Sequence, residues 1–284
     1  GNLIGGFGDH DGNRIGLNGT NLVWHGHGVV IESGTNNAIL GNVFKANAGR
    51  GIDLGNDSFA VNDIGDSDTG ANDLQNYPVV THVAFHPSDG FKEITWTLNS
   101  QPLRYYYIEV FGNDEPDPSG FGEGEDRLAS RLVLTDDKGV AAFTIPFPLT
   151  AEYISATATD AVDRNTSEFS PVDSDGDAIA DAWETRGIDF NEDGTVDLVL
   201  EGADPMHKNI YVEIDCMMGR VPDYANLVRA STGTGRGDGF LNAPNSLVQN
   251  PDGTDGIFVL YDLDETNLPA ASWNSTRFLF FDIL

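Results

Sequence analysis

Oxygen-bearing side chains recur at alternate positions in two loops that follow each other between residues 173 and 201. Carboxylates, amides and backbone carbonyls are the hard ligands that Ca²⁺ takes, six to eight at a time, and a tight loop can direct that many at one centre. The first loop offers Asp173, Asp175, Asp177, Asp181 and Glu184, with the carbonyl of Ile179 as the backbone ligand. The second loop offers Asp189, Asn191, Asp193, Asp197 and Glu201, with the carbonyl of Thr195.

The spacing of these residues matches the ligand positions of an EF-hand calcium loop. Each loop departs from that pattern at one place. The first has Ala178 where a glycine normally makes the turn. The second keeps Gly194 there but has Leu200 at the last ligand position, so Glu201 must reach in or a water must fill the place. Because two such loops stand side by side, the sequence predicts about two bound calcium ions.

The charge of this segment favours a bound cation. Ten carboxylates lie within its 29 residues against a single cation, Arg186, and they repel one another strongly unless positive charge lies among them. Two calcium ions would offset four of the nine net negative charges. The alternative is a solvated acidic linker without an ion. We expect a structural rather than a signalling role, since the segment has little apolar core of its own.

The whole chain is acidic, and this excludes two classes of partner. Its 284 residues include 15 basic and 45 acidic ones, a net charge of −30. Such a field repels nucleic acid and anionic lipid, and no run of 18 apolar residues predicts a membrane span. The single cysteine, Cys216, cannot form a disulfide within the chain. Calcium in place of disulfides is typical of a secreted or cell-surface bacterial protein. We expect a fragment of a longer chain, because both ends lie inside recognisable patterns.

Residues 1–78 contain a repeat of short aliphatic motifs with Gly and Asn at the turns. The motif at 13–16 returns at 37–41, and Gly28-Val29 returns as Gly51-Ile52, which gives a period of 23–24 residues. The stretch resembles the last coils of a right-handed parallel β-helix, in which aliphatic residues fill the axis and Asn amides bond to one another at successive corners. The polar segment 56–78 is expected to be a capping loop with Asx turns. The alternative is a third calcium site around Asp63, Asp66, Asp68 and Asn72.

Residues 79–172 read as six or seven short strands with alternating apolar residues, divided by turns such as Asp137-Lys138-Gly139. This pattern predicts an immunoglobulin-like β-sandwich. The Gly-rich acidic loop at 114–126 is favoured as a plain surface loop over a ligand or calcium site. The fold class expected for the chain up to residue 204 is therefore mainly β: β-helix end, sandwich, and the paired calcium loops of 173–204.

Residues 205–284 show a strand with alternating aliphatic residues at 210–214, a short helix after Pro222, a second strand at 256–261 and an apolar run at 277–282. Strand, helix and strand in this order predict the truncated start of an α/β domain.

The phrases at 173–177, 187–189, 193–197, 207–215 and 250–257 resemble a junction in large bacterial secreted proteins. There a calcium-loop pair of EF-hand or thrombospondin-type-3 kind precedes a zinc metallopeptidase domain. The resemblance implies a parent enzyme whose zinc is held by a His-Glu-x-x-His helix. No histidine follows His207, so that motif is absent, and we expect no zinc and no catalytic set in this chain.

Weaker candidates are His25 and His27 with His10 as a zinc set, the bases Arg14, Lys45 and Arg50 for pectate-lyase-type chemistry, and the tripeptide 236–238 for integrin binding. Each is outweighed by an ordinary surface or turn role. The sequence therefore predicts calcium-stabilised scaffolding, with calcium and the rest of its own chain as partners. The alternatives are the N-terminal part of a zinc metallopeptidase, and an adhesin that binds a polysaccharide or another cell-surface ligand.

Overall fold

The fold is mainly β, as the sequence predicts. The computed structural model describes residues 1–8, 11–19, 26–56, 59–151, 153–189, 195–223 and 248–263, with Thr266 and Leu268. Six three-residue strands form the parallel-strand unit at the N-terminus: β1 Leu3–Gly5, β2 Arg14–Gly16, β3 Val29–Ile31, β4 Ala38–Leu40, β5 Val43–Lys45 and β6 Ile52–Leu54. They pair as β1–β4, β2–β5 and β3–β6, all parallel, so the chain passes through the same three sides twice.

The register of these pairs corrects the expected period. Val29 lies opposite Ile52, an offset of 23 residues, as predicted for this side. Arg14 lies opposite Val43 and Leu3 opposite Ala38, offsets of 29 and 35. The predicted alignment of 13–16 with 37–41 is therefore wrong, because the first turn has longer connections between its strands than the second.

Side chains explain why these short strands stack. Ile4, Ile15, Ile39, Phe44 and Ile52 belong to one apolar cluster inside the unit. Asparagine amides bond from one turn to the next at the corners, as predicted: Asn2 to Asn37 at 2.8 Å, Asn13 to Asn42 at 2.9 Å, Asn18 to Asn47 at 2.8 Å and Asn37 to Asn72 at 3.1 Å. Each amide satisfies polar groups that a three-residue strand leaves unpaired.

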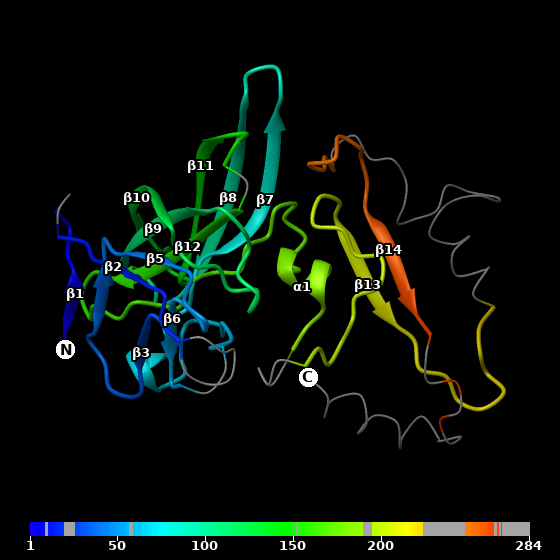
Figure 1. Ribbon diagram of the computed structural model, residues 1–284, viewed down its shortest axis with the longest axis horizontal. Coiled ribbons are helices and arrows are strands. Elements are labelled where there is room, and N and C mark those ends of the chain that lie inside the picture. Colours follow the sequence, from blue (N-terminus) through cyan, green and yellow to red (C-terminus); the bar gives the residue numbers. More distant parts are fainter. Residues whose placement is uncertain are drawn as a thin grey trace.

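Two three-stranded antiparallel sheets follow. Their strands are β7 Val79–His86, β8 Phe91–Asn99, β9 Tyr105–Asn113, β10 Asp126–Leu134, β11 Val140–Pro148 and β12 Tyr153–Asp160. The strand orders are β11-β8-β7 and β10-β9-β12. Alternate residues of all six strands enter one hydrophobic core around the fully buried Trp96, Leu98 and Ile108. These sheets and the parallel-strand unit lie together in Figure 1.

Three glutamates of the sheet region close the second turn of the parallel-strand unit. Gly41 follows β4, Asn47 follows β5 and Leu54 is the last residue of β6. Their backbone N–H groups donate to carboxylates of the following region. The acceptors are Glu109 at 2.9 Å, Glu123 at 3.0 Å and Glu168 at 2.9 Å. The exposed edge of a short parallel strand would otherwise leave these N–H groups unpaired.

The remaining elements are few. The 3₁₀ segment η1 is Ala71–Leu74, α1 is Asp181–Arg186, β13 is Asn209–Glu213 and β14 is Phe258–Asp262. Strands β13 and β14 pair in parallel, which confirms the two strands expected in this region. In Figure 1, α1 lies between the antiparallel sheets and the β13–β14 pair. The helix expected at 224–228 and the apolar run at 277–282 lie outside the described residues. Within the described ranges no helix is long and apolar enough to cross a membrane.

Candidate metal centre

The loop from Asp173 to Glu184 is wound so that its carboxylates turn inward. Asp173 accepts hydrogen bonds from the backbone N–H of Gly176 at 2.7 Å and of Ala178 at 3.0 Å. Asp175 Oδ1 accepts from Asp177 N at 3.0 Å, and Asp177 Oδ1 accepts from Ile179 N at 2.8 Å. Each carboxylate thus satisfies the backbone two to five residues further on, which fixes the alternate side chains on one side of the loop.

Ala178 adopts a left-handed backbone, with φ at 77°. This is the position at which the expected calcium loop has glycine, and the structure makes the same turn there with a residue that carries a Cβ. Left-handed backbone is unfavourable for a non-glycine residue by about 1–2 kcal/mol. The turn is therefore held by its surroundings, and the strain lies in the loop itself.

The structure brings three of the predicted ligands together. Oxygens of Asp173, Asp175 and Asp177 all lie within 4.8 Å of one another, a group that could hold a metal ion. Asp175 is 0 % exposed, and its Oδ2 has no hydrogen-bond partner among the described residues. Glu184, on α1, is 7 % exposed, and its Oε2 also has no hydrogen-bond partner among the described residues. Buried oxygens without partners are rare because they are destabilising.

The other predicted ligands of the first loop have different surroundings. Asp181 accepts from Ser174 with both oxygens, from the backbone N–H at 2.8 Å and from the hydroxyl at 2.6 Å. Asp181 and Glu184 both lie outside the group of three. Ile179 is half-buried, and its N–H is taken by Asp177.

Burial raises the pKa of every carboxyl group in this loop. The pKa of Asp175 rises to about 9, through burial first and then the charges of Asp177 and Asp173. The pKa of Glu184 rises to about 10 through burial and the neighbouring carboxylates, with Asp177 first among them. Burial likewise raises the pKa of Asp173 to about 7 and of Asp181 to about 6. A cation at the centre reverses this effect, because it favours the ionised forms.

The start of β13 lies against the carboxylates of residues 173–184. The backbone N–H of Asn209 donates to Asp177 Oδ2 at 2.6 Å, and its side-chain amide donates to Glu184 Oε1 at 3.0 Å. The Lys208 side chain also approaches the loop: its Nζ lies 3.6 Å from the point where a Cβ on Gly176 would stand. Neither residue belongs to the motif from which the site was predicted, and no spacing in the sequence indicates them.

The second loop is described only in part. Asn191 and Asp193 lie outside the described residues. Asp189 is half-buried, and the other three predicted ligands, Thr195, Asp197 and Glu201, are exposed. Short antiparallel contacts join the ends of this loop: Ile188 N donates to Leu198 O at 2.7 Å, and Asp197 N to Ile188 O at 2.8 Å. The second predicted ion site stays a prediction.

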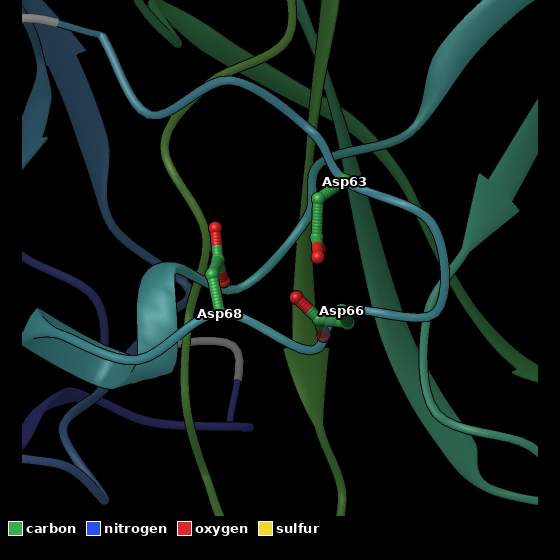
Figure 2. A group of neighbouring side chains, drawn as sticks. All are labelled: Asp63, Asp66 and Asp68. Atoms are coloured by element: carbon green, nitrogen blue, oxygen red, sulfur yellow. The ribbon is translucent and has the colours of Figure 1, made fainter.

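A second acidic group lies in the capping segment. Asp63, Asp66 and Asp68 also have oxygens within 4.8 Å of one another, and this group could hold a metal ion (Figure 2). Asp63 accepts from the backbone N–H of Ser67 at 3.1 Å and from its hydroxyl at 2.6 Å. Asp68 is only half-buried, although its Oδ1 lacks a partner within the described ranges. Asn72, named with this group from the sequence, belongs instead to the asparagine ladder.

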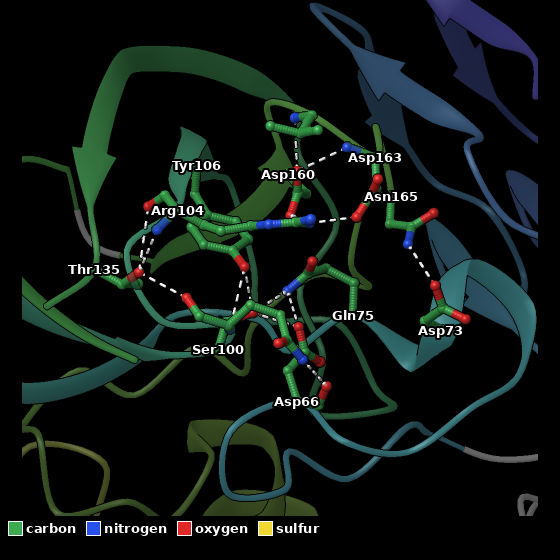
Figure 3. A network of polar contacts seen from close by, with 12 residues as sticks. Asp66, Asp73, Gln75, Ser100, Arg104, Tyr106, Thr135, Asp160, Asp163 and Asn165 are labelled. Atoms are coloured by element: carbon green, nitrogen blue, oxygen red, sulfur yellow. Dashed lines mark hydrogen bonds and ion pairs between the residues drawn. The ribbon is translucent and has the colours of Figure 1, made fainter. Parts of the chain in front are cut away.

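Asp66 is bound into a buried network rather than left free (Figure 3). Its carboxylate accepts from Gln75 Nε2 at 2.7 Å, from Asn76 N at 3.0 Å and from the hydroxyl of Ser100. Ser100 Oγ in turn lies 2.8 Å from the hydroxyl of Tyr106. Burial raises the pKa of Asp66 to about 6. The network joins the capping segment to β9, which is a structural role that the sequence pattern did not indicate.

The weaker sequence candidates are engaged elsewhere. Lys45 binds Asp114 at 2.7 Å and Glu125 at 2.6 Å, and Arg50 pairs with Glu168 at 3.4 Å. The Gly-rich loop at 114–126 thus packs on the parallel-strand unit. His27 lies 3.3 Å from Asp53, while His10, His25 and the tripeptide 236–238 lie outside the described residues.

No known family model and no curated protein matches this chain. The chemistry available to residues 173–184, the acidic loop, therefore follows from their geometry alone. An all-oxygen set of buried carboxylates without nitrogen or sulfur ligands suits a hard divalent cation.

Proposed function

We propose that the acidic loop 173–184 binds one calcium ion and that this ion stabilises a structural region of a secreted or cell-surface bacterial protein. The observation that supports this most directly is Asp175: a fully buried carboxylate with an unpartnered oxygen, beside two other carboxylates within 4.8 Å. A solvated acidic linker would expose these groups to water. Lys208 supplies one positive charge beside Asp175 and Asp177, and several buried carboxylates can remain ionised together only if further positive charge lies among them.

Calcium is the ion that fits best. Mg²⁺ demands a near-ideal octahedron and keeps several waters, whereas Ca²⁺ accepts a flexible loop that supplies most of its ligands. Zn²⁺ favours nitrogen and sulfur ligands. For loops of this kind outside the cell, affinities of about 0.1–1 mM are common. At such affinities the ion is bound where calcium is abundant, which agrees with the proposed location.

The finer fold assignments belong to the same proposal. The parallel-strand unit is taken as the last coils of a right-handed parallel β-helix, supported by its three paired sides and its asparagine ladder. The two antiparallel sheets with one core are taken as an immunoglobulin-like sandwich. Strands β13 and β14 would open an α/β domain. The resemblance to secreted metallopeptidases makes a zinc enzyme the proposed parent, and polysaccharide binding the alternative.

The test is calcium titration by calorimetry, together with melting curves in calcium and in chelator. We expect at least one ion to bind, a higher Tm in calcium, and loss of this binding in Asp175→Ala. The matched control is Asp137→Ala, which removes an exposed carboxylate from the turn between β10 and β11. Absence of binding heat, with the same Tm in calcium and in chelator, would refute the proposal. Further ions that survive Asp175→Ala would report on the second loop or on the group at Asp63.

A further inference from the structure

Asn209, the first residue of β13, lies against the carboxylates of the acidic loop and covers one side of them. Asn209 is 3 % exposed. Its backbone N–H contacts Asp177 and its amide nitrogen contacts Glu184, so it touches carboxylates from the middle and from the end of the loop. The amide nitrogen also donates to the carbonyls of Asp204 at 3.1 Å and of His207. The side chain is therefore held in one orientation by several acceptors.

Buried polar atoms without a partner gather at this one place. Within the described ranges, four such side-chain atoms are Asp175 Oδ2, Glu184 Oε2, Lys208 Nζ and Asn209 Oδ1. Three of the four are oxygens of the kind that bind calcium, two from carboxylates and one from an amide. Such concentration is not expected of a packed protein interior, where buried polar atoms are paired. A cation that contacts the three oxygens would satisfy them together.

The predicted ligand set also has a gap that Asn209 can fill. Asp181 was expected as a direct ligand, yet it lies outside the group of Asp173, Asp175 and Asp177 and, unlike Asp175 and Glu184, has a hydrogen-bond partner for each of its oxygens. Without it, Asp173, Asp175, Asp177 and Glu184 leave a calcium ion short of protein oxygens. Asn209 contacts two of these residues, Asp177 through its backbone N–H and Glu184 through its amide nitrogen, and its amide oxygen is uncharged and without a partner.

We propose that the amide oxygen of Asn209 is a ligand of the same calcium ion, so that ion binding joins the acidic loop to β13. This inference rests on the proposed calcium site and adds a ligand from a different part of the chain. The ion then links the antiparallel sheets, through the loop and α1, to the β13–β14 pair. Removal of calcium should loosen that pair as well as the loop.

The experiment compares the whole chain with Asn209→Ala and Asn209→Asp. Alanine removes the oxygen, and aspartate keeps an oxygen at the same place. Calorimetry measures calcium affinity. Terbium, which replaces calcium and is excited through the nearby Trp183, reports the number of bound waters from its luminescence decay in H₂O and D₂O. We expect Asn209→Ala to bind calcium about 10-fold more weakly, with about one additional water on the ion. Asn209→Asp should keep the water count of the unaltered protein and recover most of the affinity.

A second buried asparagine provides the control. Asn250 lies in the same region and accepts from Lys208 N at 3.1 Å, and its side-chain amide bonds to His207, Thr254 and Gly256 rather than to the acidic loop. Asn250→Ala should lower Tm and leave the water count unchanged.

The outcomes separate the inference from the proposed function. If Asn209→Ala keeps the affinity and the water count while Asp175→Ala loses binding, the calcium site stands and Asn209 is no ligand. If both Asn209 variants bind weakly with an unchanged water count, Asn209 only positions Asp177 and Glu184, and the inference is wrong. If the unaltered protein binds no calcium, the proposed function fails, and this inference fails with it.

Discussion

The backbone N–H of Leu54 donates to Glu168 Oε1 at 2.9 Å, although the two residues belong to different parts of the fold. The other oxygen of Glu168 accepts from Ala60 N at 3.1 Å and lies 3.4 Å from the Arg50 guanidinium. One carboxylate thus closes the edge of β6, holds the segment that follows it and balances a buried cation. Glu109 and Glu123 close the other two sides of the same turn. The parallel-strand unit and the antiparallel sheets therefore stabilise each other.

Replacing Glu168 with glutamine should strongly destabilise the chain above pH 7, where the carboxyl group is ionised. The residue is 1 % exposed, and the new NH₂ group would face N–H donors while Arg50 loses the charge of a carboxylate 3.4 Å away. Breaking a buried pair in this way costs about 3–5 kcal/mol. Urea unfolding followed by circular dichroism measures the loss. Glu115→Gln, at an exposed position, is the control and should change stability by less than about 0.5 kcal/mol. Equal midpoints for the two variants would show that the closing contact contributes little.

Stability in chelator should fall as pH rises above about 4.5. Burial raises the pKa of Glu123 and of Glu168 to about 7, so the folded chain holds these protons at a pH where the unfolded chain has lost them. The stabilisation is complete below the ordinary glutamate pKa and is lost as pH passes through about 7. Burial of Asp175 and Glu184, with pKa values of about 9 and 10, extends the decline to higher pH.

Melting curves at pH 5, 7 and 9, with and without calcium, measure this dependence. Calcium should restore Tm chiefly at pH 7 and 9, because it favours the ionised carboxylates of the loop. Loss of charge at low pH also reduces the general repulsion of an acidic chain. Glu123→Gln separates the two effects, since it should flatten the slope between pH 5 and 7. An unchanged slope in that variant would show that Glu123 does not contribute to the pH dependence.

Some of this structure could be predicted from local pattern. Gly28 and Gly51 directly precede β3 and β6, so the offset of these two strands is visible in the sequence. The offsets of the other sides are hidden by the longer connections in the first turn. The proximity of Asp173, Asp175 and Asp177 could be predicted from their spacing, because one loop sets both their order and their geometry.

Contacts between distant segments could not be predicted in this way. Glu109 alternates with core residues on β9 and reads as a solvent-facing residue, yet its face of the sheet is covered by the parallel-strand unit. Asn209 follows the acidic loop after more than twenty residues and carries no motif. Both gain their role from packing between segments, which single-sequence periodicity does not record.

Ala178→Gly should stabilise the acidic loop. The left-handed backbone at this residue is unfavourable with a Cβ by about 1–2 kcal/mol, and glycine removes that strain. Part of the gain is offset by the greater freedom of glycine in the unfolded chain, about 0.4–1 kcal/mol. We expect a net gain of about 0.5–1 kcal/mol in chelator and a severalfold increase in calcium affinity. Ala182→Gly, inside α1, is the matched control and should destabilise by about 1 kcal/mol. A loss of calcium affinity in Ala178→Gly would contradict this interpretation of the turn.

Gly120→Ala should disturb the calcium loop from outside. A Cβ at Gly120 would lie 2.4 Å from Trp183 Nε1, the group that donates to Ser119 O at 3.2 Å. Trp183 precedes Glu184 on α1, so its displacement should move a proposed calcium ligand. Gly90→Ala is the matched control: both glycines have positive φ, at 86° and 78°, but a Cβ at Gly90 meets nothing within 4 Å. Both variants should carry the backbone strain of about 1–2 kcal/mol. Only Gly120→Ala should also weaken calcium binding and shift the Trp fluorescence. Equal calcium affinities in the two variants would show that the contact between Gly120 and Trp183 does not position Glu184.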